Sequence, residues 1–361
     1  MSKVYLLQPN ENKGKRILSL IVNKSSMEEE KMFLKDETKD TSLEDIIFNE
    51  QEEKVEEKVE EHVRVFTETV YEASNSEKRE LLMKSDPFGE SFEAQCKRIR
   101  EESPYGNLKT WRLIKVIAKK GCDLRQEQFA MQLISQCQQI FQAAKLKIWL
   151  KPYEIISTGP NCGLLECVYD SISLDSLNKK LSALGIKGLA EFFALYYPNK
   201  KKWKQARYNF AESMAGYSLI SYLFQIKDRH NGNLLLDREG HIIHIDFDFL
   251  ISNSPGGNMM FERAPFKFTK EFMDVMHGQK SECFKHFRNL MVKGFMALQT
   301  QFRKIMVLVE MMFSVNKNLP CFIGGSKIID DLKARLFPKV EGSKEEFRIL
   351  NTGEAGTYID R

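Results

Sequence analysis

Four polar side chains are spaced so that they could act together in metal binding and proton transfer. Asp228 and Asn233 are five positions apart, and Asp246 follows Asn233 by thirteen. Both residue types offer hard oxygen ligands for Mg²⁺, and a hairpin between them would fold Asn233 and Asp246 onto one site. His230 adds a group of ordinary pKa about 6.5, able to accept a proton near neutral pH. Phosphoryl transfer needs bound metal, a cation on the phosphates and a group that receives a hydroxyl proton; this set offers the first and the last and so predicts that chemistry.

The spacing resembles the kinase catalytic loop, in which an Asp and an Asn five positions later precede a D-F-G motif. The order here is inverted, reading Asp228-Arg229-His230-Asn231-Gly232-Asn233, which resembles the phosphoinositide 3- and 4-kinase superfamily. The downstream triplet departs from D-F-G, because it reads Asp246-Phe247-Asp248.

Longer sequence runs make the resemblance more specific, to one group within this superfamily. From about Ser91 to Phe337 the chain is similar to the catalytic domain of type III phosphatidylinositol 4-kinases, most of all the beta form. The runs that carry this are Arg98 to Gly106, Val116 to Glu127, Trp149 to Tyr153, Lys227 to Asn233, His241 to Phe247, Phe272 to Met276 and Leu319 to Phe322.

The resemblance implies an α+β bilobal kinase fold, with an antiparallel sheet and a helix in the N-lobe and a mostly helical C-lobe. We expect an acidic, partly disordered or helical arm over 1–85, the N-lobe with the hinge at its end over 86–170, and the C-lobe with the catalytic and activation loops over 171–361. Apolar periodicity predicts helices over Ser91–Glu102, Asp123–Ala144, Phe210–Ile226, Phe268–Met276, Cys283–Ala297, Gln301–Phe313 and Lys327–Phe337. Alternation and β-formers predict strands over Val63–Tyr71, Trp111–Lys119, Ile148–Ser157, Gly163–Tyr169, Leu234–Asp237 and His241–Ile245, the last two as a hairpin.

Nucleotide binding is assigned by the same resemblance. Lys119 is expected to contact the ATP phosphates, with Glu127 as its acidic partner; unaided, Lys119 also fits a solvated lysine at a strand end. Glu166 and Val168 belong to the expected hinge, whose backbone bonds adenine, although a buried strand would have the same sequence pattern. Ser103 and Tyr105, in the S-P-Y-G run, are also assigned to the nucleotide.

In the catalytic loop, the resemblance makes His230 the base and Asp228 the group that orients the hydroxyl; a structural His230 is the alternative. The activation loop, from Asp246 to about Phe268, has only two basic residues, Arg263 and Lys267. Phosphates already on an inositol ring would need more cations, so this loop favours unphosphorylated phosphatidylinositol. Two incidental cations on a solvated loop are the alternative.

Three features depart from the family. Asp248 replaces a glycine, restricts the backbone and adds a charge near the metal site, where it could bind metal, raise the pKa of Asp246 or point to solvent. Cys122 stands where relatives usually have Asp. The chain ends at Arg361, where relatives usually continue into an aromatic helix that helps to dock on membrane. We therefore expect either weaker membrane binding or that the sequence is a fragment of a longer protein.

Charge is unevenly distributed. Between Met27 and His62 there are 15 acidic and 5 basic residues, a charge balance of −10. Since the net charge of the chain is +4, the remaining residues carry +14. The acidic arm is a candidate site for a regulatory protein, and its valines at 55, 59 and 63 form a helical stripe. Basic runs interleaved with aromatics are missing, which argues against nucleic acid.

The seven cysteines form no CxxC pair, which favours reduced thiols in a cytosolic protein. The longest apolar run, Ala215 to Ile226, is shorter than the roughly 20 residues of a membrane span, and the start lacks a signal-peptide core. We expect a cytoplasmic protein, peripheral on membranes, of Golgi type by resemblance.

The predicted function is transfer of the ATP γ-phosphate to the 4-hydroxyl of phosphatidylinositol, with Mg²⁺ or Mn²⁺ as cofactor. Two alternatives remain: a related kinase acting on another hydroxyl, and a catalytically impaired scaffold in which Asp248 has disabled the site.

Overall fold

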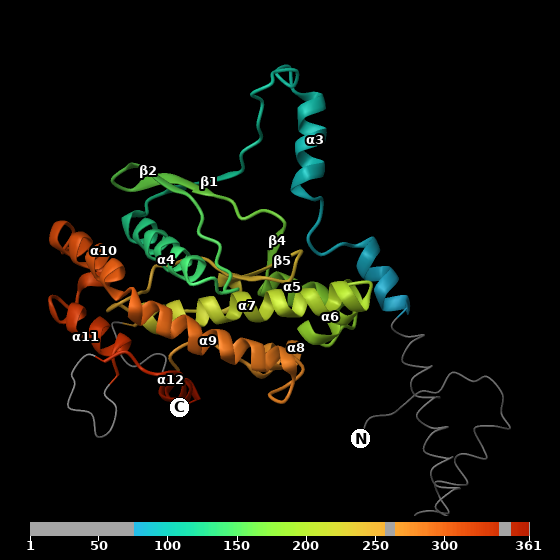
Figure 1. Cartoon of the computed structure of the whole chain (residues 1–361). Coiled ribbons are helices and arrows are strands. Elements are labelled where there is room, and N and C mark those ends of the chain that lie inside the picture. Colours follow the sequence, from blue (N-terminus) through green and yellow to red (C-terminus); the bar gives the residue numbers. More distant parts are fainter. Residues whose placement is uncertain (1–75, 257–263, 339–347, 361) are drawn as a thin grey trace, which may run out of the picture. The chain divides into compact units, whose positions relative to one another are not determined.

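The computed structural model describes residues 76–256, 264–338 and 348–360 (Figure 1). All of them belong to one unit of the chain, Ala73–Arg361. The acidic arm with its valine stripe, the predicted strand Val63–Tyr71 and Arg263 lie outside the described residues.

The first sheet has the order β1 (Val116–Lys120), β3 (Cys162–Glu166) and β2 (Ile155–Gly159), with both pairs antiparallel. Val116 is opposite Glu166 and Lys120 is opposite Cys162. Because the central strand has only five residues, it can pair with only a short stretch on either side. The predicted strands Trp111–Lys119 and Ile148–Ser157 are therefore present only in their C-terminal parts.

Residues ahead of β2 pack on a helix instead of extending the sheet. Trp149 N donates to Glu212 O at 3.2 Å, in α7 (Lys200–Phe224). A Cβ added to Gly216 of the same helix would lie 2.8 Å from Trp149 O. Glycine thus permits a close approach that draws this stretch away from the sheet.

Helix α4 (Arg125–Ala143) follows β1 and matches the predicted helix closely. Its first turn is fixed by Asp123, whose Oδ1 accepts a hydrogen bond from Arg125 N at 3.0 Å. Phe129, Leu133 and Phe141 are buried along it, and the helix contacts β2, α9 (Glu282–Thr300) and α10 (Phe302–Val315). It thereby carries its first-turn residues, Gln126 and Glu127, into the interior.

The second sheet has the order β4 (Ser171–Ser173), β5 (Leu234–Asp237) and β6 (Ile242–His244). The predicted hairpin is confirmed, with Leu234 opposite His244 in an antiparallel pair. Its turn needs glycine, since Gly240 has φ +93° and an added Cβ would lie 2.8 Å from Ala206 O. The hairpin therefore packs against α7 and leads directly from the catalytic loop to Asp246.

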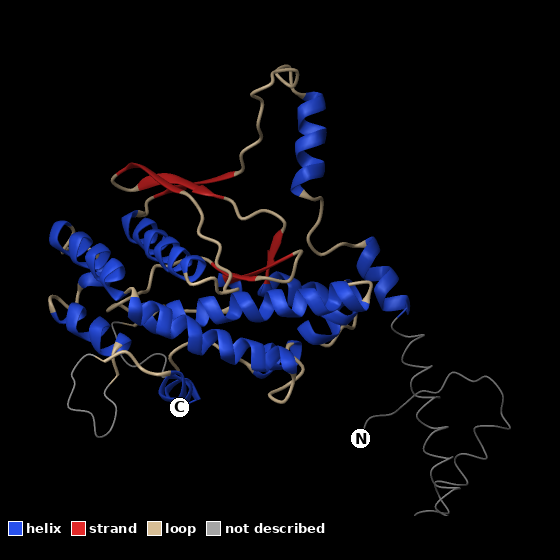
Figure 2. Ribbon diagram, viewed as in Figure 1, coloured by secondary structure: helices blue, strands red, loops and turns tan. Residues whose placement is uncertain are grey.

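Helices make up most of the remaining structure (Figure 2). α7 and α9 lie side by side, and their facing residues form much of the apolar core. The α+β bilobal fold is confirmed, with small antiparallel sheets and many helices. The other elements are α3 (Phe92–Glu102), α5 (Leu174–Ala183), α6 (Leu189–Tyr196), η1 (Asn231–Asn233), α8 (Lys270–Val275), η2 (Pro320–Phe322), α11 (Lys327–Leu336) and α12 (Thr352–Asp360).

Candidate active site

Lys119 and Glu127 form an ion pair between β1 and α4. Lys119 Nζ lies 3.2 Å from Glu127 Oε2, and the Glu127 side chain is only 4% exposed. Tyr153 donates its hydroxyl to the other carboxylate oxygen at 2.7 Å. A buried carboxylate with both oxygens hydrogen-bonded is held in place, so it positions the lysine.

Lys119 also lies within electrostatic reach of the segment after β6. Partial burial lowers its pKa, but the charge and hydrogen bond of Glu127 outweigh burial, and the charges of Asp246 and Asp248 add to them. The pKa of Lys119 is therefore raised, and the ammonium is fully charged at neutral pH. The structure thus brings the lysine and the expected metal ligand Asp246 to one site.

Arg229 holds the catalytic loop in place through hydrogen bonds to backbone carbonyls. Its guanidinium donates to Lys227 O at 2.9 Å, to Ile245 O at 2.7 Å and to Asp246 O. It also lies 5.4 Å from the centroid of the buried Phe247 ring. One buried side chain thus joins the loop to the segment that carries Asp246.

Two aspartates next to Arg229 or bonded by it, Asp228 and Asp246, have unusual backbone conformations. Asp228 has φ 61° and Asp246 has φ 62°, in the left-handed region that side chains rarely adopt. Such strain persists only when surrounding contacts enforce it, and it is concentrated at functional sites. The Arg229 bonds to this backbone supply such contacts.

Asn233 and Asp246 lie at the base of the hairpin. Asn233 is buried, and its Nδ2 donates to Asp228 O at 3.0 Å, which leaves Oδ1 as the free acceptor of the amide. Ile245 N donates to Asn233 O at 3.1 Å, so Asp246 follows directly from this pairing.

This donor set fits a divalent ion that prefers oxygen. Mg²⁺ is usually bound through one or two carboxylates together with substrate phosphates and water. Among the described residues, no group of three or more His, Cys, Asp or Glu side chains could hold a metal. Asn233 and Asp246 are the oxygen donors at the base of the hairpin that fit a metal held by one carboxylate and one amide together with phosphates and water.

His230 is exposed and lies beside Asp228. Its Nδ1 accepts a hydrogen bond from Gly232 N at 3.0 Å, and its Nε2 lies 3.9 Å from Asp228 Oδ2. In this geometry the neutral ring carries its proton on Nε2. The ring must leave Gly232 N before Nδ1 can accept a proton from a substrate.

Asp248 is joined to α4 through its backbone carbonyl, which accepts a hydrogen bond from Gln126. Its φ is not positive, so an L side chain fits here without strain, and the expected restriction does not distort this conformation. Partial burial raises the pKa of the carboxyl, as do the negative charges of Asp246 and Glu127, while Lys119 and Arg229 oppose them. Asp248 is exposed, and its carboxyl lies within electrostatic reach of Asp246 and Glu127, so it adds negative charge to the surroundings of the site.

The expected hinge runs from the end of β3 to the start of β4 and joins the two sheets. Its backbone is fixed by three hydrogen bonds: Glu166 N to Glu154 O at 2.8 Å, Cys167 N to Lys115 O at 3.0 Å, and Ser171 Oγ to Val168 O at 2.7 Å. The Glu166 carboxylate accepts from Glu154 N at 3.0 Å. The side chain of Glu166 therefore faces its own sheet, which agrees with a hinge that acts through its backbone.

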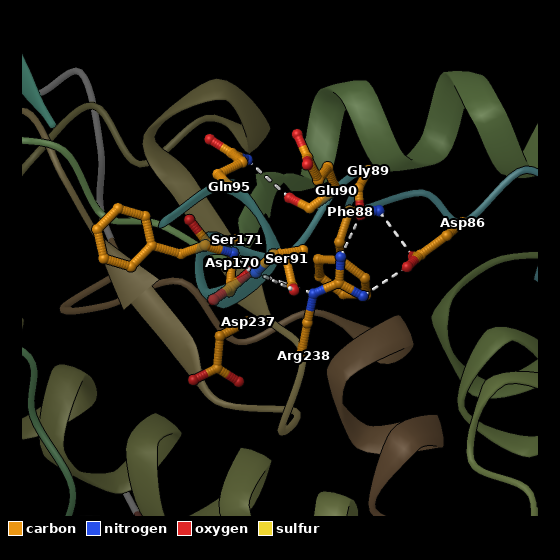
Figure 3. A network of polar contacts seen from close by, with 12 residues as sticks. Asp86, Phe88, Gly89, Glu90, Ser91, Gln95, Asp170, Ser171, Asp237 and Arg238 are labelled. Carbon is orange, nitrogen blue, oxygen red and sulfur yellow. Dashed lines mark hydrogen bonds and ion pairs between the residues drawn. The ribbon is translucent and has the colours of Figure 1, made fainter. Parts of the chain in front are cut away.

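Asp170, at the end of the hinge, is held by Arg238 from the β5–β6 turn (Figure 3). Arg238 N donates to Asp170 O at 3.1 Å, and Arg238 Nε lies 3.3 Å from Asp170 Oδ1. The same guanidinium donates to Asp86 Oδ2 at 2.5 Å and to Gly89 O. The network ties the segment before α3 to the hinge.

Of the remaining predicted residues, Ser103 and Tyr105 lie in a separate turn, whereas Lys267 lies beside the catalytic loop. Ser103 and Tyr105 are in the turn after α3, where Tyr105 N donates to Ser103 Oγ at 3.2 Å, and Tyr105 is 67% exposed. The described contacts do not join this turn to Lys119. Lys267 Nζ donates to Asn231 Oδ1 at 2.7 Å, which places the end of the activation loop beside the catalytic loop.

Comparison with known proteins identifies this arrangement. The sequence profile described as "Phosphatidylinositol 3- and 4-kinase" matches residues 113–322, which include Lys119, the catalytic loop and Asp246. The chain belongs to the phosphatidylinositol 3- and 4-kinase family. Membership implies the use of ATP and a divalent metal ion, for which Lys119, Asn233 and Asp246 are the fitting residues.

Individual members of this family show the likeness in more detail. A phosphatidylinositol 4-kinase of Dictyostelium discoideum is 47% identical over 70% of the chain, and phosphatidylinositol 4-kinase beta 2 of Arabidopsis thaliana is 48% identical over 68%. Phosphatidylinositol 4-kinase beta of Danio rerio is 41% identical over 72%. The matched regions cover 21%, 22% and 30% of these relatives, so the chain spans a fifth to a third of their length.

Sequence reasoning missed three supporting residues of this family site. Tyr153 and Gln126 occur within runs that signalled the resemblance, but nothing in the sequence shows that they face Glu127 or the Asp246 segment. Arg229 was part of the catalytic-loop motif, and only the structure shows its bonds to the backbone near Asp246.

Proposed function

We propose that this chain is a lipid kinase that transfers the γ-phosphate of ATP to the 4-hydroxyl of phosphatidylinositol, giving phosphatidylinositol 4-phosphate. The observation that carries the proposal is the Lys119–Glu127 pair within reach of the Asp246 charge. Relatives named phosphatidylinositol 4-kinase, at 40–48% identity, support the choice of substrate.

Each working residue has a defined task. Lys119 binds phosphate oxygens, and Glu127 with Tyr153 keeps it aimed. Asn233 and Asp246 would hold Mg²⁺, with Mn²⁺ as a substitute. A metal ion there would supply positive charge that stabilises the transferring phosphoryl group.

The proton of the attacking hydroxyl must leave through the catalytic loop. Asp228 orients that hydroxyl, and His230 accepts the proton after its ring turns from Gly232 N. The His230 ring and the Asp228 carboxylate are neighbours in the loop, with Nε2 3.9 Å from Oδ2 before the ring turns.

Selectivity for unphosphorylated phosphatidylinositol follows from the sparse charge of the activation loop. Lys267, one of its two basic residues, is hydrogen-bonded to Asn231 and so serves the catalytic loop as well. The proposal places the reaction at the cytoplasmic surface of a membrane, Golgi-type by family resemblance, with a regulatory protein on the acidic arm. No helix in the described part of the chain has the length and apolar character of a membrane span.

The test is transfer of ³²P from [γ-³²P]ATP to phosphatidylinositol vesicles, with Mg²⁺ or Mn²⁺. Lys119→Met should abolish labelling, whereas Lys120→Met, a neighbouring exposed lysine, should leave it within about threefold of wild type. Equal labelling by wild type and Lys119→Met would refute the assignment.

A further inference from the structure

Gln126 occupies a buried position beside Glu127, where its side-chain amide contacts two other parts of the chain. It is only 6% exposed. Its Nε2 lies 2.5 Å from Asp248 O and 3.2 Å from Phe247 O, and its Oε1 accepts from Cys321 N at 2.8 Å. We call these three hydrogen bonds the Gln126 clamp.

The clamp uses every kind of atom that a primary amide offers. Two carbonyls require the N–H donors, and one backbone N–H requires the oxygen, so the partners fix the orientation of the amide. A carboxylate would keep the bond to Cys321 N but could not donate to either carbonyl. An apolar side chain of similar length would lose all three bonds.

The η2 turn, which contains Cys321, is also hydrogen-bonded to the start of the activation loop through Ser252. Ser252 Oγ donates to Cys321 O at 2.8 Å, and Gly324 N donates to Ser252 Oγ at 3.0 Å. Phe322, next to Cys321, has its ring centroid 5.7 Å from that of Phe129 on α4. The turn η2 is therefore bonded to the start of the activation loop and packed on α4.

The clamp joins elements that the reaction must hold in register. α4 carries Glu127, which aims Lys119, and residues 247 and 248 follow directly on Asp246, a proposed metal ligand. A shift of α4 against this segment would separate Lys119 from Asp246. Displacements of about 1 Å can reduce rates by about 100-fold.

We propose that Gln126 is a positioning residue, which sets the distance between the Lys119–Glu127 pair and Asp246 through its bonds to the carbonyls of Phe247 and Asp248. The inference rests on the proposed function for its kinetic part only. The structural part concerns backbone protection and needs no substrate.

The experiment compares the full chain with Gln126→Glu, Gln126→Met and a matched control, Gln128→Met. Gln128 lies on the same helix, and its Nε2 donates to Ile155 O at 3.1 Å, in β2 rather than in the activation loop. Two quantities are measured: kcat and ATP KM for phosphatidylinositol phosphorylation, and amide hydrogen exchange of residues 246–253 and of Cys321.

Both Gln126 variants should lower kcat by about 10- to 100-fold and change ATP KM by less than about threefold, because Lys119 and Glu127 remain paired. Exchange over 246–253 should rise in both variants. The Cys321 amide should stay protected in Gln126→Glu and lose protection in Gln126→Met, while Gln128→Met should change neither quantity.

A kcat within about threefold of wild type in both Gln126 variants would overturn the proposal, as would a kcat loss in Gln128→Met equal to theirs. If the wild-type chain labels no phosphatidylinositol, the proposed function fails and exchange alone decides the clamp. Unchanged exchange over 246–253 in both Gln126 variants would then refute it.

Discussion

Asp248 shows how one residue changes the electrostatics of the site without disturbing its backbone. Its carboxyl lies near Asp246 and Glu127, and those charges together with burial raise its pKa. It brings a further negative charge to a site whose proposed ligand, ATP, is itself an anion. The charges of Asp246 and Glu127 make Asp248 a repulsive neighbour of the proposed nucleotide site, which is the explanation that the next substitution tests.

Replacing Asp248 by Asn should therefore tighten ATP binding. Removing one partly solvated like charge is worth about 1 kcal/mol or less, so ATP KM should fall by up to about fivefold, with a larger effect at low salt. Steady-state kinetics at two ionic strengths measure this. A higher KM in Asp248→Asn would show instead that Asp248 binds the metal.

His230 and Asp228 can be separated in the same way. His230→Ala should lower kcat by about 100-fold or more with ATP KM little changed, since a general base acts only in the chemical step. Single-turnover rates measure this directly. Retained turnover in His230→Ala, with loss in Asp228→Ala, would move the base to Asp228.

At the scale of elements, the hinge depends on a contact from the opposite end of the hairpin. Arg238, in the β5–β6 turn, bonds Asp170 at the hinge and Asp86 ahead of α3, and its guanidinium lies 5.1 Å from the Phe88 ring centroid (Figure 3). One cation thereby satisfies two carboxylates that belong to separate segments. Its removal would leave both carboxylates partly buried without this cation, with Asp86 bonded by Phe88 N and Asp170 by Phe92 N.

Arg238→Met should consequently lower the free energy of unfolding by about 1.5–3 kcal/mol, the range for hydrogen bonds to charged groups. Arg98→Met is the control, because Arg98 pairs with Glu90 on the exposed surface and its loss should cost distinctly less. Urea unfolding measures both. Equal losses would mean that the Arg238 network contributes no more than a surface ion pair.

The sequence predicted elements well where local signals were sufficient. α3 was predicted from Ser91 and begins one residue later, after the Ser91 cap, and α4, α9 and the β5–β6 hairpin match their predictions within a few residues. The strands at 111–115 and 148–154 were wrong, because strand formation needs a partner and β3 offers only five residues. That limit is set by tertiary structure, which alternation along the chain does not encode.

The residues of the candidate site also fall into those that the sequence predicted and those that only the structure shows. Asn233 and Asp246 were proposed from motif spacing, and Lys119 and Glu127 from the family resemblance; the structure pairs Lys119 with Glu127, and the roles of all four stay predictions. Tyr153, Gln126 and Arg229 were not predictable, since each acts through contacts with backbone or side chains 15 or more positions away. The turn with Ser103 and Tyr105 lies at the end of α3, and its nucleotide role stays a prediction.

At the scale of the whole molecule, burial divides the cysteines by reactivity. Burial raises the pKa of Cys283 to about 11 and that of Cys321 to about 12, whereas Cys122 is exposed. Thiolate, the reactive form, is therefore scarce at both buried positions at pH 8. Protonation of these thiols adds stability that is complete below their ordinary pKa of 9.0 and is lost as pH rises toward 11 and 12.

Iodoacetamide at pH 8 should accordingly label Cys122 first, and Cys283 and Cys321 only after unfolding. Mass spectrometry of the labelled peptides against time measures the order. Labelling of Cys321 as fast as Cys122 in the native protein would contradict the packing of η2 against α4.

We propose that the inverted catalytic loop phosphorylates the 4-hydroxyl of phosphatidylinositol although Asp248 follows Asp246-Phe247. The most direct measurement incubates wild type and Asp248→Gly with [γ-³²P]ATP and phosphatidylinositol vesicles, deacylates the labelled lipid and determines the ring position of the phosphate. We expect label at the 4-position from both proteins. Label at another position, or no labelled lipid from either protein, would contradict the proposal.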